Sequence, residues 1–204
     1  FYDAIDYGGA EVDDVVEAVA VLRERYPHVD TARIGITGWS HGGMIALLAV
    51  FRYPDTFAAA TAIVPVANLF HRMAVKGIAE YRRLIDPQDR FGGSPAERPE
   101  AYRARSPLFH VDRLRIPLLV HVAGNDIDVT IDESIQLVNA LLARKPRLAD
   151  VKVYDAPSGG HLFDRLVDAR TWRPAGGPDQ ADSWARLWAF FERHVADGSG
   201  ASRR

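Results

Sequence analysis

One short stretch constrains the fold of this chain more than any other: a β-branched run, a serine between glycines, and then an apolar helix. The run 33–38 favours a buried strand, and Gly38-Trp39-Ser40-His41-Gly42 overlaps its end. Residues 42–52 have the alanine, leucine and isoleucine content of a buried helix. A strand that turns sharply into a helix exposes the serine at the turn, and glycine on both sides avoids a collision between the two elements. The stretch therefore predicts a nucleophile, Ser40.

The composition fits one soluble globular domain, 1–204, because 48% of the residues are hydrophobic and 25% are charged. The net charge of -2 points to neither a nucleic acid nor a strongly charged partner. The apolar runs are too short to span a membrane. The chain has no cysteine, which excludes disulfides and a cysteine nucleophile. Since Phe1 rather than Met stands first, no targeting signal is readable, and the compartment stays open between cytoplasm and secretion.

Strands and helices alternate along the chain, which is typical of a parallel α/β sheet. Strands are predicted over 33–38, 57–66, 117–123 and 151–155, and helices over 11–26, 42–52, about 132–144 and about 180–195. The segment at about 68–114 mixes charged helix-like stretches with turn formers. It predicts a helical excursion over the substrate site.

Serine alone is a poor nucleophile and needs a histidine base that an acid holds in place. In α/β-hydrolases the chain order is serine, acid, histidine, with each partner in a loop after a strand. Here the third predicted strand leads into Asp126 and Asp128, and the fourth leads into a glycine-rich loop with His161. Both loops leave the carboxyl ends of strands, the edge that also carries Ser40 and where ligands bind in open α/β sheets. The residues themselves leave the acid open between Asp126 and Asp128.

Of the seven histidines, His161 is the one that combines a post-strand glycine-rich loop with the required order. His41 follows the nucleophile directly, so its side chain points away while its backbone N–H serves the oxyanion hole. Trp39, Asp128 and His71 are candidates for the substrate pocket. The acidic residues near the amino end lack the spacing of a metal loop, so neither a metal nor a cofactor is predicted.

These residues resemble the catalytic domain of the prolyl oligopeptidase family, which includes dipeptidyl peptidases and acylaminoacyl peptidases. The resemblance covers nearly the whole chain, through Asp6–Val16, the serine turn, Ser106-Pro107-Leu108, Asn125–Val129, Gly160-His161 and the aromatic terminal helix. In that family the catalytic aspartate takes the first of two acidic positions, which implies Asp126. Members usually have glycine before the serine and tyrosine after it, where this chain has Trp39 and His41.

The resemblance implies an α/β-hydrolase fold, a parallel sheet flanked by helices, whose first strands are missing. Four strands normally precede the one that feeds the serine turn, and none is readable before residue 33. A loop after one of them supplies the second oxyanion N–H. We therefore read the chain as the carboxyl-terminal portion of the domain, with an unpaired edge on its first strand.

The expected chemistry is acyl transfer through an acyl-enzyme, with Ser40, His161 and Asp126 as the triad. The best match is a serine peptidase of the prolyl oligopeptidase type. The alternatives are a carboxylesterase of the same fold acting on small acyl esters, and a non-catalytic fragment without a complete oxyanion hole. The expected partner is a small peptide or ester substrate, with no nucleic acid and no membrane. The sequence does not predict an oligomeric state or the acyl and leaving groups.

Overall fold

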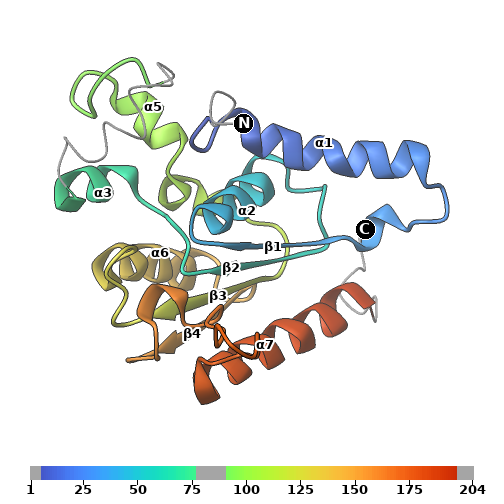
Figure 1. Ribbon diagram of the computed structural model, residues 1–204. Helices are drawn as coiled ribbons and strands as arrows, with labels where there is room; N and C mark the ends of the chain where they lie inside the picture. Colours follow the sequence, from blue (N-terminus) through green and yellow to red (C-terminus); the bar gives the residue numbers. More distant parts are fainter. Residues whose placement is uncertain (1–5, 77–90, 197–204) are drawn as a thin grey trace.

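The protein is represented by a computed structural model that describes residues 6–76 and 91–196. Its sheet has four parallel strands in the order β1-β2-β3-β4 (Figure 1). The strands are β1 (Gly35–Trp39), β2 (Ala59–Ile63), β3 (Leu118–Ala123) and β4 (Ala149–Tyr154). Each of them overlaps a predicted strand. The second is shorter than predicted because Val64 takes a positive φ of 41°, which ends the extended backbone.

Helices connect the strands and cover the sheet on both faces (Figure 1). Before β1 come α1 (Ala10–Arg25) and a short 3-10 helix, η2 (Thr31–Arg33); α2 (His41–Arg52) joins β1 to β2, and α6 (Ile131–Arg144) joins β3 to β4. After β4 come the 3-10 helix η5 (Gly160–Leu162), α7 (Gly177–Phe191) and a π-helical turn (Glu192–Ala196). This alternation puts the carboxyl ends of all four strands at one edge of the sheet.

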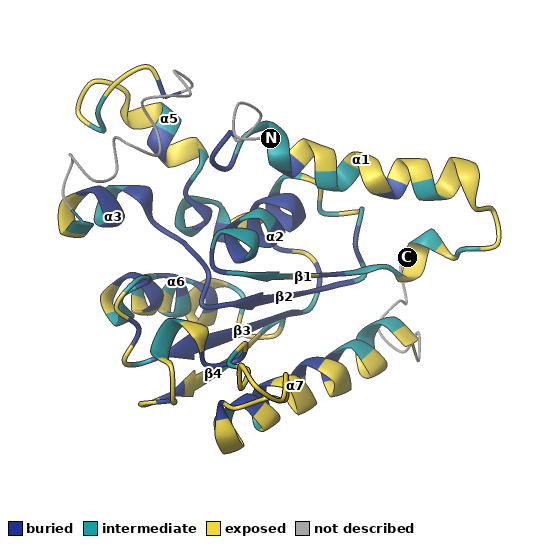
Figure 2. Cartoon of the chain, in the orientation of Figure 1, coloured by how far each residue is buried: buried dark blue, intermediate teal, exposed yellow. Residues whose placement is uncertain are grey.

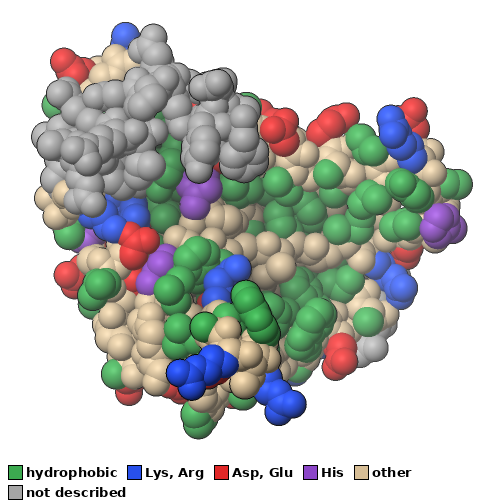
Figure 3. Space-filling view, in the orientation of Figure 1, with side chains coloured by type: hydrophobic (Ala, Val, Ile, Leu, Met, Phe, Trp, Pro, Cys, Tyr) green, Lys and Arg blue, Asp and Glu red, His purple; other side chains and the backbone are tan. Residues whose placement is uncertain are grey.

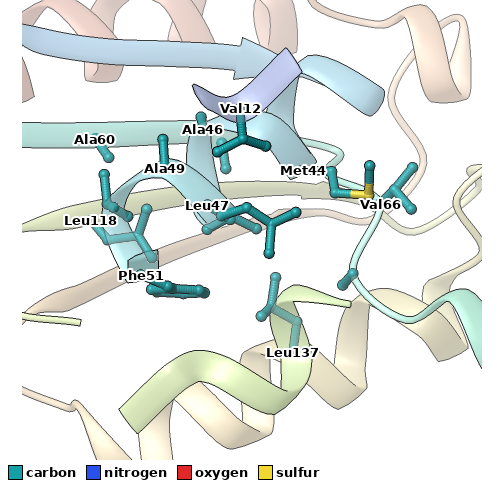
Figure 4. Close-up of a cluster of buried hydrophobic side chains, with 14 of the residues drawn as sticks. Val12, Met44, Ala46, Leu47, Ala49, Phe51, Ala60, Val66, Leu118 and Leu137 are labelled. Carbon is teal, nitrogen blue, oxygen red and sulfur yellow. The ribbon is translucent and has the colours of Figure 1, made fainter. Parts of the chain in front are cut away.

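The two faces of the sheet bury different residues of the same strands. Ala60 and Leu118 belong to the larger core with α1, α2 and α6, to which Leu47 and Leu137 contribute (Figure 4). Leu119 lies one position further along β3 and packs instead with α7. Strands β2 and β3 are therefore buried throughout (Figure 2), and apart from Thr61 and His121 their sequences are apolar without alternation.

The predicted excursion consists of α3 (Leu69–Lys76), α5 (Pro99–Ala104) and the 3-10 helix η4 (Pro107–Arg113). Its residues 77–90 lie outside the described part of the chain. Helices α3 and α5 contact each other beside the sheet, whereas η4 packs against both α2 and α6. Val111 and Leu114 are completely buried, so the end of this segment belongs to the core rather than to a surface excursion. Among the described helices, none is long and apolar enough to cross a membrane.

Candidate active site

Ser40 occupies the turn between β1 and α2. Its backbone angles, φ 54° and ψ -117°, lie in a region that residues with a side chain rarely adopt. Its N–H donates to the carbonyl of Ile63 at 2.9 Å, and its own carbonyl accepts from the N–H groups of Met44 and Val66 at 3.0 and 3.2 Å. The adjacent strand and the helix thus hold the serine in a strained conformation, with its hydroxyl at the carboxyl edge of the sheet.

The prediction that glycine is needed on both sides of Ser40 is right for one side and wrong for the other. A Cβ atom on Gly38 would lie 2.0 Å from the carbonyl oxygen of Gly42, whereas a Cβ on Gly42 would meet nothing within 4 Å outside its own helix. A Cβ on Gly43 would lie 2.9 Å from the Cβ of Pro65. In the described part of the chain, Gly38 is therefore required where β1 meets α2, and Gly43 where α2 meets the segment after β2.

The structure brings Ser40, His161 and Asp126 together in one chain of hydrogen bonds. The Nε2 atom of His161 lies 2.9 Å from the Oγ of Ser40, and its Nδ1 lies 2.6 Å from the Oδ2 of Asp126. The other carboxylate oxygen of Asp126 accepts the backbone N–H groups of Asp128 and Val129, at 2.8 and 2.9 Å. Because its own loop holds one oxygen, the other is fixed toward the imidazole. The side chains of Asp126 and His161 are 1% and 11% exposed, so this chain of hydrogen bonds is largely shielded from water.

Asp128 approaches the imidazole at Nε2, whereas Asp126 contacts Nδ1. Its Oδ2 is 3.3 Å from the Nε2 of His161, the same ring nitrogen that faces Ser40. Its Oδ1 accepts hydrogen bonds from Arg72, at 3.3 Å, and from Lys76. Both cations come from α3, so this helix holds the carboxylate of Asp128 close to His161 and Ser40. On the face shown in Figure 3, histidine, acidic and basic side chains gather at this edge of the sheet.

The groups that anchor α3 are not predicted from the sequence. Arg72 is buried and donates to the backbone carbonyl of Asp128 and to the Oε2 of Glu133, both at 3.2 Å. The Oε1 of Glu133 accepts the N–H groups of Ala67 and Asn68, at 2.8 and 3.0 Å. Glu133 is 1% exposed, and every hydrogen bond that it accepts links α6 to the segment after β2. The sequence shows these charges but not that they meet.

Trp39 was a pocket candidate, and the structure places it against the loop that carries His161. Its indole N–H donates to the backbone carbonyl of His161 at 3.0 Å, and the two ring centroids are 4.6 Å apart. The guanidinium of Arg165 lies 4.6 Å from the centroid of the Trp39 ring. A second link comes from Asn125, whose side-chain amide donates to the carbonyl of Pro157 at 3.1 Å and so ties the aspartate loop to the histidine loop.

The side chain of His41 points toward α1 rather than toward His161 and Asp126. Its Nε2 lies 2.7 Å from a carboxylate oxygen of Glu11, and its ring meets that of Tyr7 edge-on at 4.3 Å between centroids. Its backbone N–H is at the first position of α2 and has no acceptor within the helix. This N–H and the positive end of the helix dipole both favour a negative charge beside Ser40.

His71, the remaining pocket candidate, contacts α6 and the residue before it rather than Ser40, His161 or Asp126. Its Nε2 lies 3.2 Å from the hydroxyl of Thr130, and its Nδ1 lies 3.3 Å from the amide nitrogen of Gln136. These contacts fix α3 to α6. The described residues contain no group of three or more histidine and acidic side chains arranged to hold a metal ion.

Comparisons with known proteins agree on one family. A profile of the prolyl oligopeptidase family matches residues 1–198. The acylamino-acid-releasing enzyme of Arabidopsis thaliana is 30% identical over 139 residues, which are 67% of this chain and 18% of that protein. The structure of Porphyromonas gingivalis dipeptidyl peptidase 4 has a TM-score of 0.72 and 26% identity, over 92% of this chain and 23% of its own. A Mycobacterium tuberculosis puromycin-hydrolyzing peptidase has a TM-score of 0.71 and 26% identity, over 93% and 26%.

The chain thus spans 18% to 26% of the length of these relatives. The predicted fold class is confirmed, because the parallel sheet flanked by helices matches the α/β-hydrolase fold of family members. The resemblance found in the sequence is confirmed, because the family profile spans residues 1–198. The chain belongs to the prolyl oligopeptidase family.

Proposed function

We propose that this chain carries the catalytic centre of a serine peptidase, with Ser40 as nucleophile, His161 as general base and Asp126 as the acid that orients it. One observation carries the proposal: the imidazole of His161 lies between its two partners, 2.6 Å from the carboxylate and 2.9 Å from the hydroxyl. Both distances are within the range for a nucleophile and base that exchange a proton. The strained backbone of Ser40 adds support, since such strain concentrates at active sites.

In the proposed mechanism, the Nε2 of His161 takes the proton of Ser40 as Oγ attacks the carbonyl carbon of the substrate. The carboxylate of Asp126 stabilises the imidazolium and keeps its Nδ1 protonated. The imidazolium then gives its proton to the leaving amine, and the acyl group stays on Oγ. Water, deprotonated by the same imidazole, attacks the acyl-enzyme and releases the acid. The proton of Ser40 thus leaves with the amine, and the proton taken from water returns to Oγ as the acid departs, so the triad ends in its starting state without a cofactor.

The backbone N–H of His41 is the proposed oxyanion donor. Loss of one such donor typically costs about 2.7–4 kcal/mol of transition-state stabilisation. In α/β-hydrolases a second N–H comes from a loop after an earlier strand. The described residues before β1 form α1 and η2 and contain no strand. Activity should therefore be measured on the full-length protein.

The relatives favour a peptide-type amide over an ester as substrate. One is named for releasing acylamino acids, one is a dipeptidyl peptidase, and one is a puromycin-hydrolyzing peptidase. A paired panel tests the class of substrate: aminoacyl p-nitroanilides against short acyl p-nitrophenyl esters. Turnover of the amides supports a peptidase, and turnover of the esters alone would replace it with a carboxylesterase.

Labelling with a fluorophosphonate probe tests the triad itself. The probe should label the full-length protein at Ser40, and labelling should be lost in Ser40→Ala and in His161→Ala. Ser158→Ala is a matched control, because Ser158 is an exposed serine three residues from His161. Its labelling should equal that of the wild type. Persistent labelling of Ser40→Ala would refute the assignment of the nucleophile.

A further inference from the structure

One carboxylate oxygen beside the nucleophile has no role in the mechanism above. We propose that the Oδ2 of Asp128 binds the α-ammonium group of an aminoacyl substrate, so that the enzyme removes amino acids that have a free amino group. This inference rests on the proposed peptidase function and names the substrate class of the same site. It assigns Asp128 a role in specificity rather than in the chemical step.

The first argument is the direction in which α3 holds the carboxylate. Arg72 and Lys76 both donate to Oδ1, and Arg72 also donates to the backbone carbonyl of Asp128. Because α3 holds Oδ1 through these hydrogen bonds, Oδ2 faces the imidazole of His161, 3.3 Å from Nε2. The side chain of Asp128 is 39% exposed, so a ligand can reach it, whereas that of Asp126 is 1% exposed.

The second argument is reach. A carbonyl carbon poised for attack lies about 3–3.5 Å from the nucleophilic oxygen. Backbone bond lengths and angles then place the α-nitrogen of an aminoacyl group about 2.5 Å from that carbon. Nε2 of His161 is within hydrogen-bond distance of Ser40 Oγ, at 2.9 Å, and close to Asp128 Oδ2, at 3.3 Å. Oδ2 is therefore near enough to Oγ for an aminoacyl group to bridge the two oxygens with a hydrogen bond to its nitrogen.

The third argument is charge. The carboxylates of Asp128 and Glu133 pair with the cations of Arg72 and Lys76, while that of Asp126 pairs with the imidazole of His161. Together these side chains carry one net negative charge when His161 is neutral. An ammonium group neutralises that charge and gives Oδ2 a charge-assisted hydrogen bond. An acylated nitrogen brings no charge and only one N–H. The site therefore favours a free amino group over a blocked one.

The competing explanation is that Asp128 only helps to orient His161. The two explanations predict different results for a pair of substrates with and without an N-acetyl group, alanyl and N-acetylalanyl p-nitroanilide. The full-length enzyme should hydrolyse the free amine with a higher kcat/KM, by about 10-fold or more. The preference should fall as the pH rises through about 8, where an α-amino group loses its proton.

Asp128→Asn should reduce the ratio of the two kcat/KM values by about 10- to 100-fold, mainly through the KM of the free amine. Asp132→Asn is the control: it removes the same charge from an exposed residue four positions away and should keep the wild-type ratio. Equal turnover of both substrates by the wild type overturns the inference, as does an equal loss for both in Asp128→Asn.

Fluorophosphonate labelling separates a failure of this inference from a failure of the proposed function. A protein that is labelled at Ser40 but hydrolyses the acetylated substrate as well as the free one, or hydrolyses neither, keeps its nucleophile and contradicts the role of Asp128. A protein that is neither labelled nor active contradicts the proposed function and the inference together.

Discussion

Trp39→Phe should slow catalysis without weakening substrate binding. The substitution removes the indole N–H that donates to the carbonyl of His161 at 3.0 Å, while a phenyl ring keeps much of the contact with the imidazole. A neutral hydrogen bond contributes about 0.5–1.5 kcal/mol, and a carbonyl left unpaired costs about 1–3 kcal/mol. Because the residue is only partly buried, we take about 1–2 kcal/mol for the histidine loop, which corresponds to about a 5- to 30-fold lower kcat.

The chain offers a closely matched control. Trp184 also donates its indole N–H to a backbone carbonyl of the same loop, that of Asp164, at 2.8 Å. That carbonyl is three residues from His161, and Trp184 is 40% exposed on α7. Trp184→Phe should therefore lower kcat by less than about 3-fold, since its hydrogen bond does not fix the catalytic imidazole directly.

The assay is steady-state hydrolysis by the full-length protein, with kcat and KM determined separately for the wild type and both variants. If Trp39 lines the substrate pocket instead, Trp39→Phe should raise KM and leave kcat unchanged. That result would refute the reasoning, and so would an equal loss of kcat in both variants. Fluorophosphonate labelling at saturating probe confirms that each variant is folded.

Three further predictions concern the turn at Ser40, the buried ion pair of Glu133 and Arg72, and His121 in the core. Gly38→Ala should abolish probe labelling, whereas Gly42→Ala should keep most of it, because only the first adds a Cβ that collides with backbone. Glu133→Gln should destabilise the domain by about 3–5 kcal/mol in thermal unfolding, against a negligible effect of the exposed control Glu100→Gln. Burial lowers the pKa of His121 to about 4. Below pH 6.5, the unfolded chain therefore binds more protons at His121 than the folded protein does. As the pH falls from 6.5 to 4, the folded protein should lose about 3 kcal/mol of stability. His121→Asn should reduce this pH dependence of the free energy of unfolding, as measured by urea titration.

The sequence indicates that the three catalytic candidates meet at one edge of the sheet because the signals are local. A β-branched run before Ser40 and glycine-rich or acidic loops after two other strands are enough, since carboxyl ends of parallel strands share one edge. The order of residues along the chain does not show how the side chains meet. The structure shows that His161 lies between Ser40 and Asp126. The catalytic roles remain predictions that the labelling experiment tests.

The sequence could not predict what α3 does. Arg72 and Glu133 pair although they are 61 residues apart, and neither the helical spacing nor the charge of either residue indicates its partner. Asp164 gave no signal either. It is buried with no hydrogen-bond partner for its carboxylate in the described part of the chain, and burial raises its pKa. Such pairings depend on how segments cross in space, which periodicity does not encode.

Asp126 and Asp128 show how two similar residues, two positions apart, take different tasks. The loop itself orients Asp126, because its Oδ1 accepts the N–H groups of residues 128 and 129. Asp128 is oriented from outside the loop, by Arg72 and Lys76 of α3. Arg72 also holds the backbone carbonyl of Asp128, whereas Lys76 donates to its side chain. A substitution at Lys76 should therefore move the carboxylate of Asp128 while the N–H groups of residues 128 and 129 keep Asp126 in place. Such a substitution should alter which substrates bind while Ser40 keeps its reactivity toward a small probe, which separates selection of the substrate from the chemistry.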